Sequence, residues 1–254
     1  MLPLGCSPTV QSTNSNTPHI HSPPRTVRPG EVFLRPYQSS DLQAVRRICA
    51  DTGFLGQPID RVFEDRELFA DYLTAYHTRF EPDALLVCEV QGQVRGYLMG
   101  CRRPLRKQAY QLFANLAVAT KALYRCYARP YNRASRAFLR WVMLNSWREV
   151  PAAPRHTPHF HLNILPDARS VRNTRAMIRT FLDFLRAHGH GQVYGQMVTY
   201  GSRRNERLFN RYGFRVMDRA EVTKFRGLYH GRVVLCTVLK DLRTVSSTGG
   251  ERRM

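Results

Sequence analysis

Apolar residues along this chain recur with two different spacings, and the alternation between the spacings outlines the secondary structure. Leu42, Val45 and Ile48 recur at helical spacing behind a polar capping sequence. Two apolar runs of strand length, 84–90 and 94–101, flank a glycine-containing turn and predict a hairpin. In chain order the pattern predicts a strand at 31–37, a helix beginning after 41, a helix at 60–76, the hairpin, a strand at 159–165, a helix at 170–188, a strand at 193–200, a short helix at 203–211, and strands at 216–225 and 233–239.

The segment 102–150 interrupts this alternation of strands and helices. It is predicted to be helical, with a kink or break at Pro130, because proline lacks the N–H that a helix interior needs. Residues 1–30 are rich in Ser, Thr, Asn and Pro without any apolar period, which predicts a disordered N-terminal tail, and 242–254 read as a polar, disordered C-terminal tail. Residues 31–241 are therefore expected to form one α/β domain, with a mostly antiparallel sheet, flanking helices and a helical insert.

Composition places the chain among ordinary globular proteins, since 43% of its 254 residues are hydrophobic and 23% are charged. No apolar stretch reaches 18 residues, so no membrane span is expected, and residues 1–10 do not have the pattern of a secretory signal. The six cysteines show neither a CxxC motif nor paired spacing, which favours a reduced, cytoplasmic protein without a zinc site. The net charge of +20 suits a polyanionic partner, although a codon bias toward arginine gives the same composition.

Three segments make this order of elements recognisable. LNILPDARSVRNTRAMI (162–178), SRRNERLFNRYGF (202–214) and LLVCEVQGQVRGYLMG (85–100) resemble, respectively, the acetyl-CoA-binding strand, loop and helix, the later helix that ends in Gly-Phe, and the early hairpin of the GNAT N-acetyltransferase family. The resemblance covers roughly 31–101 and 157–241. It implies the GNAT fold, acetyl-CoA as the acyl donor, and direct transfer of the acetyl group to an amine, without a metal or a covalent intermediate.

The resemblance also implies which residues hold acetyl-CoA. In the family, the strand before the loop is splayed from its neighbour and its backbone pairs with the pantetheine arm. Asn163 interrupts the apolar run there, as a bulge or an active-site position would. The residues assigned to the cofactor in this way are Leu162, Asn163, Ile164 and Leu165 in the strand, Arg169, Ser170, Val171, Arg172, Asn173, Thr174 and Arg175 at the loop and helix start, and Asn205 in the later helix.

The loop departs from the family pattern at its small residues. A helix N-terminus offers unpaired N–H donors and partial positive charge to a phosphate, and glycines usually allow the close approach. Here Ser170, Arg172 and Thr174 occupy these positions. Either Arg172 binds phosphate directly together with Arg169 and Arg175, or the site is degraded and the protein inactive.

Acetylation of an amine needs a base for the ammonium proton and an acid for the leaving thiolate. His159 and His161 alternate on the strand at 159–165 and therefore project to one face, and His161 is our candidate base. The family's frequent acid, a tyrosine four residues before the glycine of Gly-Phe, is replaced by Phe209. Tyr212, one residue before that glycine, is the candidate substitute.

Charge is distributed unevenly between the acceptor side and the insert. Between 60 and 89 there are eight acids and three arginines, which predicts either an acidic wall that favours a cationic amine or a solvated helix face. The span 90–148 contains no acid. On one continuous helix, its arginines at steps of three and four would form a single stripe suited to an anionic membrane surface, to nucleic acid, or to the cofactor's phosphates as a lid. These arginines are Arg125, Arg129, Arg133, Arg136 and Arg140.

The expected function is therefore that of a GNAT-type N-acetyltransferase with an unidentified amine acceptor, located in the cytoplasm or at the periphery of a membrane. Two alternatives remain: a catalytically inactive relative that binds acyl-CoA, and a basic module that binds nucleic acid or a membrane surface on the same fold.

Overall fold

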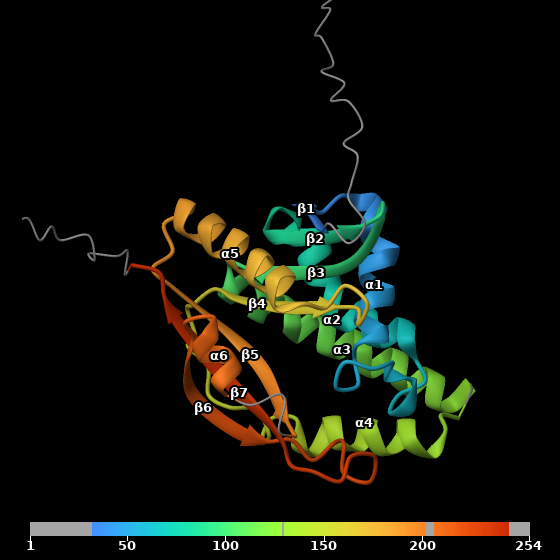
Figure 1. The fold of residues 1–254 in the computed structure, drawn as a ribbon. Coiled ribbons are helices and arrows are strands. Elements are labelled where there is room, and N and C mark those ends of the chain that lie inside the picture. Colours follow the sequence, from blue (N-terminus) through green and yellow to red (C-terminus); the bar gives the residue numbers. More distant parts are fainter. Residues whose placement is uncertain (1–31, 129, 202–205, 244–254) are drawn as a thin grey trace, which may run out of the picture.

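A single mixed sheet organises the part of the chain that the computed structural model describes, namely residues 32–128, 130–201 and 206–243 (Figure 1). Neighbouring strands are antiparallel except at one junction, between β4 and β5, which is parallel. In sheet order the seven strands are β1 (Val32–Pro36), β2 (Leu85–Val90), β3 (Gln93–Cys101), β4 (His159–Ile164), β5 (Gln192–Tyr200), β7 (Val233–Asp241) and β6 (Arg215–Glu221).

Helices cover both faces of this sheet. Residues of α5 and α6 pack with β2, β3, β4, β5 and β7 in one buried cluster, whereas α1 and α2 pack on the opposite side chains of β2 and β3. The helices are α1 (Leu42–Asp51), α2 (Arg66–Phe80), α3 (Pro104–Ala128), α4 (Arg133–Asn145), α5 (Val171–Ala187) and α6 (Arg207–Arg211), with 3-10 turns η1 (Ser39–Asp41), η2 (Ile59–Arg61) and η3 (Pro82–Ala84).

The observed order of elements confirms the order predicted from the apolar pattern, and the largest boundary error is at the start of α2. The predicted helix at 60–76 begins at Arg66, because Asp65 accepts a hydrogen bond from the N–H of Leu68 and caps the helix there. Residues 59–61 form the separate turn η2 instead. The strand predicted at 216–225 ends at Glu221.

The predicted C-terminal boundary at 242 is also displaced. Leu242 is only 2% exposed, belongs to the main buried cluster, and its N–H donates to the carbonyl of Gly191 at 2.9 Å. The ordered domain therefore extends past 241. Residues 1–30 and 244–254 of the predicted tails lie outside the described part of the chain.

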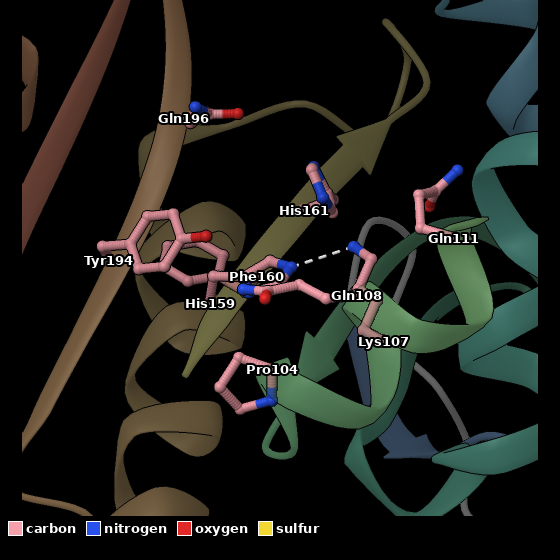
Figure 2. A pocket seen from close by; sticks show the side chains of 9 residues that line it. All are labelled: Pro104, Lys107, Gln108, Gln111, His159, Phe160, His161, Tyr194 and Gln196. Atoms are coloured by element: carbon pink, nitrogen blue, oxygen red, sulfur yellow. Dashed lines mark hydrogen bonds between the residues drawn. The ribbon is translucent and has the colours of Figure 1, made fainter. Parts of the chain in front are cut away.

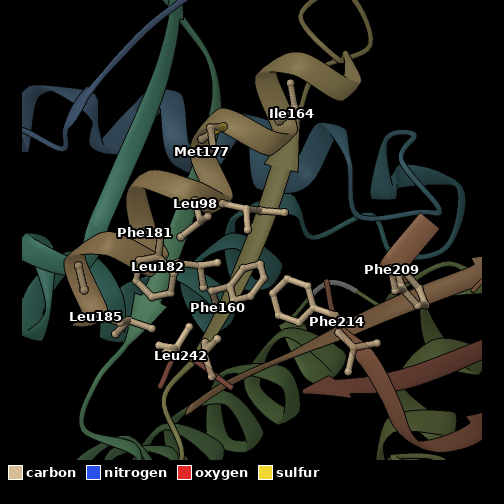
Figure 3. Close-up of a cluster of buried hydrophobic side chains, with 14 of the residues drawn as sticks. Leu98, Phe160, Ile164, Met177, Phe181, Leu182, Leu185, Phe209, Phe214 and Leu242 are labelled. Atoms are coloured by element: carbon tan, nitrogen blue, oxygen red, sulfur yellow. The ribbon is translucent and has the colours of Figure 1, made fainter. Parts of the chain in front are cut away.

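The principal core lies between α5 and the sheet (Figure 3). Met177, Phe181 and Leu185 follow one another at helical spacing on the buried face of α5 and are at most 1% exposed. The Phe160 ring of β4 lies 5.7 Å from the Phe181 ring and 5.8 Å from the Phe214 ring. This packing fixes β4 against α5, and so it also fixes where the side chains on the opposite face of β4 point.

Gly100 of β3 is required by this packing. A Cβ at this position would lie 2.2 Å from the Phe181 ring and 2.9 Å from the carbonyl oxygen of Ala84. We expect Gly100→Ala to destabilise the protein by about 1–3 kcal/mol, the usual cost of overpacking a core, as measured by urea unfolding. Gly195→Ala is the matched control, because its Cβ would lie at ordinary contact distances, 3.4 Å from the Phe160 ring and 3.6 Å from Met197 Cε. Equal unfolding midpoints for the two variants would contradict this account.

The insert between β3 and β4 forms two helices that separate at Pro130, as predicted. Since α3 ends at Ala128 and α4 begins at Arg133, the expected single arginine stripe is wrong. Arg125 lies at the end of α3 and pairs with Asp65, whereas Arg133, Arg136 and Arg140 are exposed on α4. Arg129, the fifth arginine of the predicted stripe, lies outside the described residues. None of the helices described here combines the length and apolarity needed to cross a membrane.

Candidate active site

The two parallel strands at the centre of the sheet pair over two residues only and then diverge (Figure 1). His159 is opposite Tyr194 and Phe160 is opposite Gly195, after which β4 continues along β3 and β5 continues along β7. Across 161–164, therefore, the edge of β4 that faces β5 has no strand partner among the described residues. Backbone N–H and C=O groups along such an edge are available to a ligand.

A pocket of about 300 Å³ lies where the strands diverge (Figure 2). One side is formed by β4 and β5, and the other by the first three turns of α3. The insert therefore supplies part of the wall. The lining residues are Pro104, Lys107, Gln108 and Gln111 of α3, His159, Phe160 and His161 of β4, and Tyr194 and Gln196 of β5.

His159 and His161 reach this pocket because side chains alternate along a strand. Phe160, between them, is 2% exposed and packs into the core on the opposite face. The prediction that both histidines share one face is confirmed, with their ring centroids 5.7 Å apart.

Lys107 contacts His159 directly, with 2.9 Å between Nζ and Nε2. An ammonium group can only donate, so Nε2 accepts and the imidazole proton is on Nδ1. This Nδ1 is buried and has no hydrogen-bond partner among the residues that the structure describes. Burial and the Lys107 charge lower the pKa of His159 well below its ordinary value, and burial lowers the pKa of Lys107 as well.

His161 is held neutral by the same environment. Burial, followed by the nearby charge of Lys107, lowers the pKa of His161 to about 3. A third imidazole lies behind it: the His77 ring is 6.0 Å from the His161 ring, its Nδ1 donates to the carbonyl of Gly100 at 2.8 Å, and burial lowers its pKa too. Despite these three rings, no group of three or more His, Cys, Asp or Glu side chains in the described chain is arranged to hold a metal ion.

Tyr194 supplies the only phenol among the residues that line this pocket. Its ring lies 5.0 Å from that of His159, and burial raises the pKa of Tyr194 to about 12. The hydroxyl therefore keeps its proton throughout the physiological range. A neutral imidazole and a protonated phenol thus lie on two neighbouring strands at the point where the strands separate.

The strand residues assigned to the cofactor lie at this divergence but use their side chains elsewhere. Leu162 and Ile164 pack into the α5 core. Asn163 Nδ2 donates to Thr52 Oγ1 at 2.5 Å. The Leu165 N–H donates to the carbonyl of Arg95 at 2.9 Å. The pairing of β3 with β4 runs through Ile164 without a register shift, so no bulge occurs at Asn163 on that edge.

The start of α5 is held by two polar side chains. Ser170 Oγ accepts the N–H of Asn173 at 3.0 Å, and Asn173 Nδ2 donates to the carbonyl of Ala168 at 2.7 Å. The Arg169 guanidinium donates to the carbonyl of Ile164 at 2.8 Å, and its part in holding phosphate stays a prediction. Of the other residues assigned here, Thr174 is half-buried, and Val171, Arg172 and Arg175 are exposed on the first turns of the helix.

The later helix contributes less to the pocket than expected. Phe209 is 1% exposed and serves the core, as its apolar side chain requires. Tyr212 packs partly buried against the same cluster, its carbonyl accepts from Lys240 Nζ at 2.8 Å, and it does not line the pocket. Its catalytic role stays a prediction. Asn205 lies outside the described residues.

The acids at 60–89 do not form an acidic wall for this pocket, because none of them lines it. Most are paired with arginines or capping groups: Asp60 with Arg66, Asp71 with Arg46, and Asp83 with Arg102. Glu81 is fully buried and accepts from the Tyr76 hydroxyl at 2.6 Å and from the Arg102 N–H at 2.6 Å. These carboxylates hold helices in place and leave the pocket without an anionic group.

Sequence analysis missed the residues that the insert and β5 bring to the pocket, above all Lys107, Tyr194 and Gln196. One signal could have found Lys107. The chain uses lysine at only four positions, 107, 121, 224 and 240, while arginine supplies the other basic residues. Three of these four lysines, Lys107, Lys224 and Lys240, are half-buried, so a lysine in this chain marks a position where a compact ammonium fits.

The fold of this chain is similar to the folds of several solved structures. The crystal structure of SsHAT shares 21% sequence identity with this chain, covering 84% of it and 98% of that chain, with a TM-score of 0.54. An acetyltransferase structure shares 15% identity over 83% of this chain and 99% of that one, with a TM-score of 0.50. An N-acetyltransferase from Staphylococcus aureus Mu50 shares 14% identity, with coverages of 84% and 99% and a TM-score of 0.48. No protein-family model and no curated protein sequence matches the chain.

Proposed function

From this GNAT acyltransferase fold we propose that the protein transfers an acetyl group from acetyl-CoA to an amine seated in the pocket at the β4–β5 divergence. The observation that carries the proposal is the pocket itself, where neutral His161 and protonated Tyr194 face a common space beside an unpaired stretch of β4. A base and an acid in one pocket are what amide formation from a thioester needs.

The chain offers features that fit acetyl-CoA. Across 161–164 the free edge of β4 presents N–H and C=O groups at the repeat of an extended chain, which matches the amide-containing pantetheine arm. The start of α5 presents helix N–H groups, and exposed Arg172 and Arg175 bring cationic donors to the same turn. This end of the helix would hold the pyrophosphate.

The proton transfers are assigned to two side chains. The acceptor reacts as its free amine, which attacks the thioester carbonyl carbon, and His161 accepts the proton that the nitrogen loses. The new C–N bond replaces the C–S bond, Tyr194 donates its proton to the departing sulfur, and the proton held by His161 then restores the Tyr194 phenol. Lys107 is a positioning residue, since it fixes the His159 tautomer beside these groups.

The acceptor is expected to be an uncharged polar molecule apart from its amine. The pocket contains three amide side chains, Gln108, Gln111 and Gln196, and no carboxylate. Amides recognise hydroxyl and amide groups, whereas a polycationic amine would meet no counter-charge here.

We expect Arg172→Glu to weaken acetyl-CoA binding at least tenfold, because a charge-assisted hydrogen bond contributes about 1.5–3 kcal/mol. Calorimetric titration measures it, with micromolar binding expected for the wild type. Arg179→Glu is the matched control, because this substitution makes the same charge change two turns further along α5. Equal weakening of acetyl-CoA binding by both variants would show that only the net charge of the protein matters. No binding by the wild type at low salt would show that acetyl-CoA is not the acyl donor.

Turnover separates the enzyme from the inactive acyl-CoA-binding alternative. Release of free thiol from acetyl-CoA is to be followed with a panel of polar primary amines, including amino sugars and peptide N-termini. Acetyl-CoA binding without thiol release for any amine, and without acetylated product by mass spectrometry, would favour the inactive relative.

A second candidate function rests on α4. Arg133, Arg136 and Arg140 are exposed on one face of this helix at steps of three and four, which suits an anionic membrane surface or nucleic acid. Binding to either polyanion that falls steeply with added salt and is lost in the triple Arg→Gln variant would support it, whereas salt-independent or absent binding would exclude it.

A further inference from the structure

The side of α3 that faces away from the pocket is apolar and exposed. Seven large side chains along it, from the first turn to the last, are each between 59% and 92% exposed. Monomeric proteins rarely leave an apolar surface of this extent open to water. The seven are Leu105, Leu112, Phe113, Leu116, Leu123, Tyr124 and Tyr127, which we call the α3 seam.

No charged residue of α3 interrupts the seam. Arg106 lies over the Phe80 ring at 5.0 Å, and Lys107 points into the pocket. Lys121 lies 4.0 Å from Asp71, and Arg125 pairs with Asp65. Each of the four cations of the helix therefore has a partner on the body of the protein, with the side chains of Lys121 and Arg125 still 64% and 52% exposed.

The spacing of the seam indicates what kind of partner it fits. Starting at Leu105, residues at steps of four and three are Leu105, Ala109, Leu112, Leu116, Ala119 and Leu123, all exposed. This is the 3.5-residue apolar repeat by which one helix packs along another. Small alanines between the leucines provide holes into which leucines of a facing helix fit.

We propose that the α3 seam packs antiparallel against the α3 seam of a second copy, across a two-fold axis near Leu116. A two-fold interface must be complementary to itself, and an uncharged row of leucines and alanines meets that condition. Leu116 is midway between Leu105 and Tyr127, so in the antiparallel arrangement the whole row is covered.

The surface involved is large enough for a stable dimer. Seven side chains of this size, each at least 59% exposed, present on the order of 800 Å² of mostly apolar area per copy. Two copies would therefore bury on the order of 1,600 Å², the size of a standard specific interface. A membrane surface is the weaker partner, because helices that lie on anionic bilayers carry free lysine or arginine beside their apolar face, whereas the cations of α3 contact groups of the protein body.

Sedimentation of the full chain as a function of concentration tests this proposal independently of any enzymatic activity. We expect the wild type at micromolar concentration to have twice the 29.4 kDa chain mass, and Leu116→Glu to have the chain mass. Leu228→Glu is the control: Leu228 is 51% exposed but lies in the β6–β7 connection, and this variant should stay dimeric. Circular dichroism melts verify that both variants fold, and Leu123→Glu provides a second seam variant.

Cross-linking tests the register. With Leu116→Cys, mild oxidation should give a covalent dimer that the wild type does not form under the same conditions. A wild-type chain that remains monomeric up to about 100 μM would overturn the proposal. Such a monomer that floats with vesicles of anionic lipid, and loses flotation in Leu116→Glu, would assign the seam to a membrane instead.

Discussion

Replacing His161 by glutamine is expected to lower the turnover number of acetyl transfer by 10²–10⁴-fold, the usual contribution of a positioned general base. Glutamine fills the same part of the pocket and keeps a hydrogen-bonding group, but it cannot take up a proton. Binding of acetyl-CoA should stay within about threefold of wild type, because the loss falls on a group needed in the transition state. Coupled thiol detection at saturating amine gives the turnover number, and calorimetry gives the affinity.

His188→Gln is the control for this variant, since His188 is exposed at the end of α5 and contacts the Phe184 carbonyl rather than the pocket. Turnover by His161→Gln at the wild-type rate would exclude His161 as the base. The pH profile adds an independent readout. With the pKa of His161 at about 3, its protonation should not depress activity between pH 5 and 7. In Lys107→Met the loss of a neighbouring positive charge raises that pKa, so the acid limb should move to higher pH.

We expect the free energy of unfolding to fall more steeply with decreasing pH than protonation of the carboxylates alone would cause. Burial lowers the pKa of His77, His159 and His161 below the ordinary value of 6.5. Between that value and the folded-state pKa, the unfolded chain therefore binds more protons than the folded one. The free energy of unfolding should be greatest above pH 6.5 and fall as the pH decreases, by about 1.4 kcal/mol per pH unit for each histidine and roughly 4 for the three together.

Urea unfolding at pH 7.5, 6.5, 5.5 and 4.5 measures this slope. The step from pH 6.5 to 5.5 isolates the histidines, because the carboxyls of the unfolded chain, with ordinary pKa values of about 4, bind few protons there. A paired carboxyl such as Asp41, whose pKa is lowered by its hydrogen bond with Arg35, adds to the slope only below about pH 5. His77→Asn should reduce the slope by about one proton while keeping a donor toward the Gly100 carbonyl. A wild-type free energy that is flat from pH 6.5 to 5.5 would show that the three imidazoles titrate normally.

Local signals in the sequence were sufficient for most of the fold. The β2–β3 hairpin was predictable because Gln91 and Gly92 form a tight turn, with φ of 50° and 76°, between two apolar runs. The start of α5 was predictable because Ser170 is a capping residue before a strongly periodic segment. In each case the residues that decide the structure are neighbours in the chain. The sheet topology confirms the α/β class, and the likeness to solved structures confirms the GNAT fold.

The pocket was only half predictable, for a physical reason. Strand alternation alone places His159 and His161 on one face, whereas Lys107 reaches them from an insert 52 residues earlier in the chain. Similarly, the start of α2 depends on Asp65, which is held by Arg125 and by the Tyr131 hydroxyl at 2.8 Å. Whether the acids at 60–89 form an acidic wall or ion pairs depends on which arginines the fold places beside them. These contacts join residues far apart in the chain, so no periodic pattern in the sequence predicts them.

The helices of the insert also carry apolar side chains that the rest of the protein needs. Tyr131 is 5% exposed in a cluster with Phe63 and Val222, against which Phe138 and Trp141 of α4 pack. Removing 106–148 would therefore open this cluster to water, and loss of turnover in such a deletion would report unfolding. Point variants in the pocket and in the seam test function without that complication.

The position of the insert also bears on the order in which the chain folds. β3 and β4 are antiparallel neighbours, yet the segment 102–158 separates them where a hairpin would need only a few residues. Closing a loop of this length costs about 2 kcal/mol more chain entropy than closing a short hairpin. The β2–β3 hairpin has a local connection and can form first, whereas the β1–β2 ladder, which closes across 37–84, and the β3–β4 ladder must wait. The pocket, built from α3, β4 and β5, is consequently completed near the end of folding. Substitutions in it should mainly change the rate of unfolding, leaving the rate of folding nearly unaltered.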